Sequence, residues 1–175
     1  MLTRIALLLL FAMGPAAAGS GGEAGHYLEN DEYLNSVFAA DPPAARVLWV
    51  TGELRTAVEA MLEHDFAALR VRYWRDGARS AWILDEIGKE LPITIGVTVE
   101  AGAIENVRVL AFRESRGWEV RYPFFTDQFA NARLGPEGRL DRRIDGITGA
   151  TMSVHAVTRI ARIALLMHEH VASAE

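Results

Sequence analysis

A cluster of hydroxyl-bearing and small residues lies directly before the last predicted helix, in the segment 145–151, Asp-Gly-Ile-Thr-Gly-Ala-Thr. Thr148 and Thr151 supply hydroxyl groups. Gly149 lets the backbone come close to a bound group, and Ala150 keeps the entrance small. The first amides of a helix have no internal partners, and the helix dipole favours negative charge there. The segment therefore predicts a phosphate-sized site. The alternative is a threonine that only caps the helix.

The same segment resembles the flavinylation motif of the FMN-binding domain family. That family includes the flavin subunits of the sodium-pumping NADH:quinone reductase and of the Rnf complex. In the motif Ser/Thr-Gly-Ala-Thr the last threonine carries FMN through a phosphoester bond, and Thr151 is the matching residue here. The resemblance implies that Thr148, Gly149 and Ala150 help to hold the cofactor. It also implies that Asp145 belongs to the signature read by the flavin transferase.

The resemblance covers the chain from about residue 46 to the C-terminus, including a hairpin over 93–112 and the loop after it. In the named subunits this loop reads Glu-Thr-Pro-Gly, whereas residues 114–117 here are Glu-Ser-Arg-Gly. The family places the loop near the flavin, so the resemblance implies that Glu114, Gly117 and the nearby Tyr122 contact the cofactor.

Aromatic residues follow that loop closely, and an isoalloxazine ring packs well against an aromatic face. The alternative is that they belong to the hydrophobic core, which we expect for three of the five. Arg116 or Arg121 would stabilise a reduced, anionic flavin or its phosphate, or would lie in solvent. The five aromatic residues are Trp118, Tyr122, Phe124, Phe125 and Phe129.

The resemblance implies a flavoprotein electron carrier and not an enzyme with its own catalytic residues. Thr151 would be an acceptor for a flavin transferase that uses FAD and Mg²⁺, because a threonine hydroxyl is a weak nucleophile without an activating base. Membrane-bound and extracytoplasmic redox proteins would be its partners. Two alternatives stay open: an exported module that holds FMN or another phosphate ligand non-covalently, and an assembly factor of a membrane redox complex.

The N-terminal residues are typical of a secretory signal peptide over residues 1–18. Arg4 provides the positive charge, an apolar run covers 5–13, and three alanines offer a cleavage site. We therefore expect a periplasmic or otherwise extracytoplasmic protein, with an uncleaved anchor as the alternative. Residues 19–45 are expected to form a flexible lead-in and a short helix. Residues 46–175 are expected to form the FMN-binding domain.

Composition excludes several classes of chemistry. The chain has 175 residues and no cysteine, which rules out disulfides, thiolate metal sites and iron–sulfur clusters. Its formal net charge of -5 gives no electrostatic support for nucleic-acid binding, which makes the Gly-Ile-Thr-Gly match to an RNA-binding loop at 146–149 uninformative. Redox activity would therefore depend on a cofactor, and a flavin supplies it.

The elements that must position the segment 145–151 follow an α, β, α order, then hairpins, then a long helix. Alternating apolar residues predict strands over 93–99 and 107–112, and a helical period predicts a helix over 151–171. Further predicted elements are a helix beginning near Asn30, strands at 46–50, 69–73 and 81–84, and a helix over 53–63. This order predicts an α+β fold in which a small antiparallel sheet of hairpins packs with helices.

The histidines of the last predicted helix give one weaker candidate. His168 and His170 are two residues apart, so on a helix they point to different faces and make a poor metal pair. His155 lies one turn after Thr151 and is placed to contact a phosphate there. No metal site is predicted.

Overall fold

The computed structural model describes residues 25–174, so the predicted signal peptide lies outside the described residues. Six strands form one antiparallel sheet in the order β1-β6-β5-β4-β3-β2. The strands are β1 (Gly25–His26), β2 (Arg46–Trp49), β3 (Arg70–Asp76), β4 (Arg79–Ile87), β5 (Pro92–Glu100) and β6 (Ala103–Phe112). The α+β prediction with a sheet of hairpins is confirmed.

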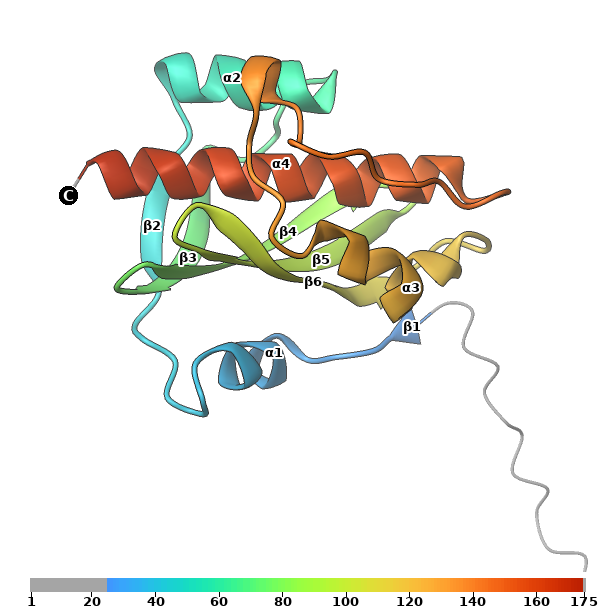
Figure 1. The fold of residues 1–175 in the computed structure, drawn as a ribbon, viewed down its shortest axis with the longest axis horizontal. Helices are drawn as coiled ribbons and strands as arrows, with labels where there is room; N and C mark the ends of the chain where they lie inside the picture. The colour runs from blue at the N-terminus through green and yellow to red at the C-terminus, as the bar shows by residue number, and fades with distance from the viewer. Residues whose placement is uncertain (1–24, 175) are drawn as a thin grey trace, which may run out of the picture.

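Helices cover both faces of this sheet (Figure 1). The helices are α1 (Asn30–Val37), α2 (Gly52–Leu62), α3 (Pro123–Thr126) and α4 (Thr151–Ser173), with short 3-10 turns η1 (Trp118–Arg121), η2 (Asp127–Phe129) and η3 (Pro136–Gly138). Helix α4 lies along one face, α1 lies on the other, and α2 packs on the outer side of α4. Among the described residues no helix has the length and hydrophobicity of a membrane span.

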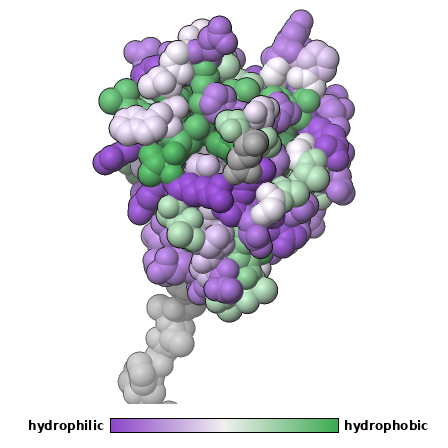
Figure 2. All heavy atoms as spheres, turned by 90° about the vertical axis from the view of Figure 1, so that its left-hand side faces the viewer, coloured by the Kyte–Doolittle hydropathy of each residue, from purple (hydrophilic) through white to green (hydrophobic). Residues whose placement is uncertain are grey.

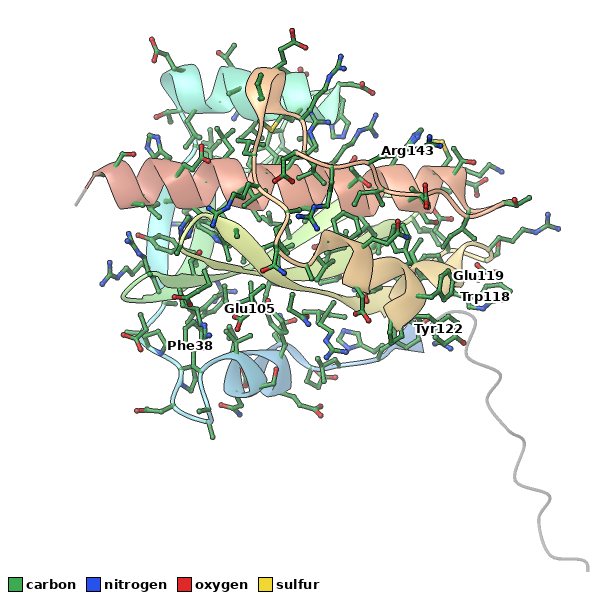
Figure 3. The ribbon with its side chains drawn as sticks, in the orientation of Figure 1. Phe38, Glu105, Trp118, Glu119, Tyr122 and Arg143 are labelled. Carbon is green, nitrogen blue, oxygen red and sulfur yellow. The ribbon has the colours of Figure 1, made fainter. Side chains whose placement is uncertain are left out.

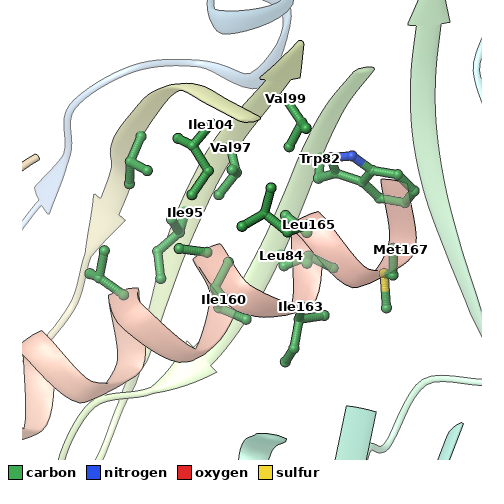
Figure 4. Packing of buried hydrophobic residues seen from close by; sticks show 14 of the residues in the cluster. Trp82, Leu84, Ile95, Val97, Val99, Ile104, Ile160, Ile163, Leu165 and Met167 are labelled. Atoms are coloured by element: carbon green, nitrogen blue, oxygen red, sulfur yellow. The ribbon is translucent and has the colours of Figure 1, made fainter. Parts of the chain in front are cut away.

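The main core lies between α4 and the central strands. Ile95 and Val97 of β5 face Ile160 and Leu165 of α4, and all four side chains are buried to 1 % exposure or less (Figure 4). The apolar positions of α4 recur at helical spacing, so one face of the helix meets the sheet over its whole length. This contact fixes both the direction of α4 and the place where it begins.

The opposite face of β5 is also buried, which the alternating pattern alone did not indicate. Thr98 is buried, and its Oγ1 lies 2.9 Å from the hydroxyl oxygen of Tyr33 in α1. The Tyr33 ring lies directly over Gly96, where an added Cβ would come within 2.7 Å of ring atom Cζ. Gly96 is thus required by the close approach of α1 to the sheet.

The far end of α4 is fastened to the β3–β4 hairpin. Arg75 Nη1 donates to the carbonyl oxygen of Val171 at 3.1 Å. Figure 2 views this end of the molecule, where hydrophobic side chains gather above a band of hydrophilic ones.

A buried polar network lies beside that fastening. Gly102 N–H donates to His168 Nε2 at 3.3 Å, so Nδ1 carries the proton and donates to Ser80 Oγ at 2.7 Å. The same oxygen accepts from Trp82 Nε1 at 2.8 Å. His168 thus has a structural role, and His170 is exposed on another face, as the spacing predicts.

The first prediction concerns Gly96. We expect Gly96→Ala to lower the free energy of unfolding by about 1–3 kcal/mol, because the new methyl group must displace the Tyr33 ring. Denaturant unfolding measures this loss. Gly25→Ala is the control, since its Cβ would lie 3.7 Å from the nearest atom. Equal stability of the two variants would contradict the packing argument.

A second prediction concerns pH. Burial, with a contribution from Arg75, lowers the pKa of His168 below its ordinary value. The stability it contributes is therefore fully present above about pH 6.5 and is lost as the pH falls below that value. We expect the melting temperature of His168→Asn to fall less between pH 7.5 and 5.5 than that of the unaltered chain. Parallel pH profiles would show that another group titrates. The hydrogen bond to Glu86 raises the pKa of His64, so protonation of His64 favours the folded state as the pH falls. This effect opposes the loss of stability, and it is the same in both proteins.

Candidate functional site at the start of the long helix

The first turn of α4 is open to a ligand. Thr151 is the first residue of the helix and is exposed, and no side chain of the described residues caps the helix at Ala150. The first helical hydrogen bond runs from the Val154 amide to the Ala150 carbonyl oxygen at 2.9 Å. The amides of residues 151–153 therefore have no helical partner. The simple N-cap interpretation of Thr151 is wrong.

The turn that leads into the helix depends on Gly149. Its φ of 84° lies in the left-handed region, and an added Cβ would meet no atom within 4 Å. Backbone conformation therefore requires glycine here, and the space beside it is open. Thr148 lies in the same turn and is exposed, while Ala150 is buried.

Three segments that are distant in sequence surround this helix start and form a pocket of about 510 Å³, the loop pocket. It lies where β4 and β6 end and α4 begins. Its lining residues are Lys89, Glu90, Glu114, Ser115, Arg116, Gly149, Ala150, Thr151, Met152 and Ser153. The structure thus brings Glu114 together with Thr151, Gly149 and Ala150, whereas Lys89, Glu90 and Met152 carried no signal in the sequence.

Glu114 holds the loop pocket together. Its carboxylate is buried, and Oε1 accepts hydrogen bonds from the amides of Lys89 at 2.5 Å, Glu90 at 2.6 Å and Leu91 at 2.9 Å. Burial alone would raise the pKa of Glu114, but the three donors outweigh it and the pKa lies below its ordinary value. An added Cβ on Gly88 would come within 2.9 Å of the same oxygen. The carboxylate thus positions the loop after β4.

Gly117 lies against the first turn of α4. Its φ is 91°, and a Cβ there would collide with the side chain of the buried Ser153 and contact Ala150. The loop after β6 can therefore approach the helix start only with glycine at this position. Gly117 thus lies beside the helix start, although it does not line the loop pocket itself.

Asp145, Tyr122 and Thr148 do not line the loop pocket. Asp145 is exposed, with Arg143 Nε at 3.6 Å from its Oδ1, and its amide donates to Gln128 Oε1 at 2.7 Å. The Arg121 guanidinium lies between two rings, 4.4 Å from the centroid of Tyr27 and 4.8 Å from that of Tyr122. Tyr122 lies near α3, and Arg143 lies near the first part of α4 (Figure 3).

The aromatic stretch after the loop divides between core and surface. Phe125 and Phe129 are fully buried and Trp118 packs partly buried against the core, whereas Tyr122 and Phe124 are exposed. Their short helices, α3, η1 and η2, were not predicted from sequence.

A second pocket, of about 520 Å³, lies on the other side of Thr151, between α4 and the segment that precedes it. We call it the arginine pocket. Its lining residues are Arg139, Leu140, Arg142, Ile144, Gly146, Thr151, Val154, His155, Thr158 and Arg162. The placement of His155 one turn after Thr151 agrees with the helical spacing. Among the described residues no group of acidic residues and histidines is arranged to hold a metal ion.

The loop pocket gives a third prediction. Glu114→Ala leaves three amides without their acceptor, so we expect the free energy of unfolding to fall by about 1–3 kcal/mol. Glu114→Gln keeps a carbonyl oxygen and should lose less. Denaturant unfolding at pH 7 compares them, with the exposed Glu90→Ala as control. Equal losses for the Ala and Gln variants would contradict the role assigned to the acceptor.

Comparison with known proteins gives one match. Residues 88–166 match the model of the FMN-binding domain family, and this range contains every residue that lines the two pockets beside Thr151. No curated protein and no solved structure was similar enough to this chain to count as a match. Residues 88–166 therefore form an FMN-binding domain.

Proposed function

We propose that this protein is an exported flavin electron carrier with FMN joined covalently to Thr151. The observation that carries the proposal is the exposed threonine at an uncapped helix start, inside a domain of the FMN-binding family. A hydroxyl at that position meets the requirement for a phosphoester, and the free amides beside it favour a phosphate. The resemblance of segment 145–151 to the flavinylation motif identifies Thr151, and not Thr148, as the acceptor.

The residues present fit an FMN group. A pocket of about 510 Å³ lies within the usual range for small-ligand sites, and Thr151 lies on its lining. Lys89 and Arg116 contribute positive charge to that pocket, and Met152 contributes an exposed apolar surface. Two carboxylates also line it, but Glu90 is paired with Lys89 and Glu114 is bound to backbone amides. Arg116 is therefore the cation that remains for a phosphate. A bound flavin supplies the redox chemistry that a chain without cysteine lacks.

The chain's own residues then have positioning roles. Glu114 holds the loop that carries Lys89, and Gly117 brings the loop after β6 against the helix start. Gly149 gives the backbone the turn from which Thr151 begins the helix. Tyr122 lies outside the loop pocket, so its proposed contact with the flavin requires the cofactor to extend beyond that pocket.

Attachment would be the work of a flavin transferase that uses FAD and Mg²⁺. Thr151 Oγ would form a bond to the phosphorus of the FMN half, and the bond between this phosphorus and the bridging oxygen of the pyrophosphate would break. AMP would leave with the electron pair, and the hydroxyl proton would pass to a base of the transferase. The exposure of Asp145 supports a role as a recognition mark for that enzyme.

The proposed setting is the periplasm or another extracytoplasmic space, with residues 1–18 acting as the export signal. There a covalent bond keeps the cofactor from being lost by dilution. The proposed partners are a membrane-bound electron donor or acceptor and a second redox protein outside the cytoplasm.

Intact-mass measurement tests the attachment. The mature chain, purified from a strain with a flavin transferase, should carry the mass of one FMN less one water, and Thr151→Ala should carry none. Ser173→Ala is the control, because it removes an exposed hydroxyl at the other end of α4, outside both pockets, and should keep the adduct. An adduct that survives Thr151→Ala would refute the assignment. Flavin that is lost on denaturation would show non-covalent binding instead.

A further inference from the structure

The arginine pocket is unusual in its charge. It is lined by three arginines and a histidine, and none of its lining residues is acidic. The whole chain, in contrast, has a formal net charge of -5. Cations that gather in one concave site of an acidic protein create a local positive potential. The site therefore favours an anionic ligand.

Arg162 is the cation that is least compensated by the protein. Its Nε donates to the carbonyl oxygen of Gly138 at 2.5 Å, and no carboxylate of the described residues lies within ion-pair distance. Burial lowers the pKa of its guanidinium, with smaller contributions from the charges of Arg139 and Arg159, while the more distant carboxylate of Glu63 opposes this shift in part. The contact with Gly138 fixes the guanidinium while leaving its charge available to a ligand.

The two other arginines differ in how firmly they are held. Arg142 donates to the carbonyl oxygens of Ala130 at 2.7 Å and Asn131 at 3.0 Å, and its Nε lies 3.4 Å from Asp141 Oδ1. Arg139 is exposed, with Glu137 at 3.7 Å as its ion-pair partner. Arg142 is thus held by two backbone acceptors, whereas the side chain of Arg139 is exposed and accessible to a ligand in the pocket.

The remaining lining residues indicate what kind of anion fits. Leu140, Ile144 and Val154 give the pocket apolar surface, and Thr151 and Thr158 bring hydroxyl groups. Arginines recognise phosphate oxygens, and apolar side chains accommodate a planar base or ring. The pocket volume of about 520 Å³ is large enough for a nucleotide.

We propose that the arginine pocket is a nucleotide phosphate site, in which Arg162 and Arg139 bind the phosphate of a ligand beside Thr151. The phosphate has two possible sources, which share this chemistry. One is the phosphodiester of the flavin on Thr151, in which case the inference rests on the proposed function. The other is a free nucleotide that binds on the opposite side of Thr151 from the loop pocket.

Calorimetric titration of AMP into the chain purified without a transferase tests this site. AMP should bind, and adenosine, which lacks the phosphate, should not. Arg162→Gln and Arg139→Gln should each weaken AMP binding by roughly tenfold or more. Because Arg139 is exposed, its variant does not depend on how well the Arg162 variant folds. Arg143→Gln, near the start of α4 but outside the pocket, is the matched control and should bind AMP as before (Figure 3).

The same titration with the flavin-loaded chain identifies the source. Loss of AMP binding on loading would mean that the attached flavin phosphate fills the pocket, and retained binding would assign the pocket to a free nucleotide. Absence of AMP binding to the unloaded chain, or binding that neither arginine variant weakens, would overturn the inference. Flavin loading, measured separately by intact mass, reports on the proposed function, so the two can fail independently.

Discussion

The buried contact between α4 and the strands β4, β5 and β6 determines where every group of the site lies. Large side chains such as Ile160, Ile163 and Leu165 are withdrawn from water completely, and each contributes about 1.5–3 kcal/mol to the hydrophobic stabilisation. A helix bound along its length by such contacts can neither slide nor rotate without exposing them. Its first residue, Thr151, is therefore held at one end of the sheet, where the strands β4 and β6 also end.

The loops after β4 and β6 are placed by contacts of a different kind. A single buried carboxylate oxygen of Glu114 gathers three amides of the loop after β4, and Gly117 permits van der Waals contact with the first turn of α4. Hydrophobic packing thus sets the overall position of the site, and backbone hydrogen bonds and glycine geometry set its walls. Because hydrogen bonds need defined directions, the walls are more specific in shape than the core that supports them.

The sequence predicted the elements with strong periodicity and missed those without it. The alternation in β5 and the helical spacing in α4 identified both elements and their order, and the motif at 145–151 identified the family. The burial of both faces of β5 was not predictable, because it depends on α1 and on Tyr33 lying over Gly96. The arginine pocket was missed for a related reason. No local sequence pattern relates Arg139 to Arg162, which line one pocket only in the folded chain.

The length of α4 has a consequence for any group carried on Thr151. A helix of 23 residues extends for about 35 Å, and its far end is fixed to the β3–β4 hairpin. A cofactor on Thr151, at the first residue of α4, is therefore remote from the end of the molecule where α4 stops. Electrons would then have to enter and leave at the same end, so donor and acceptor would compete for one contact area and dock in turn. Such a carrier would receive electrons in one encounter and deliver them in another, and would not pass them between two partners bound at the same time.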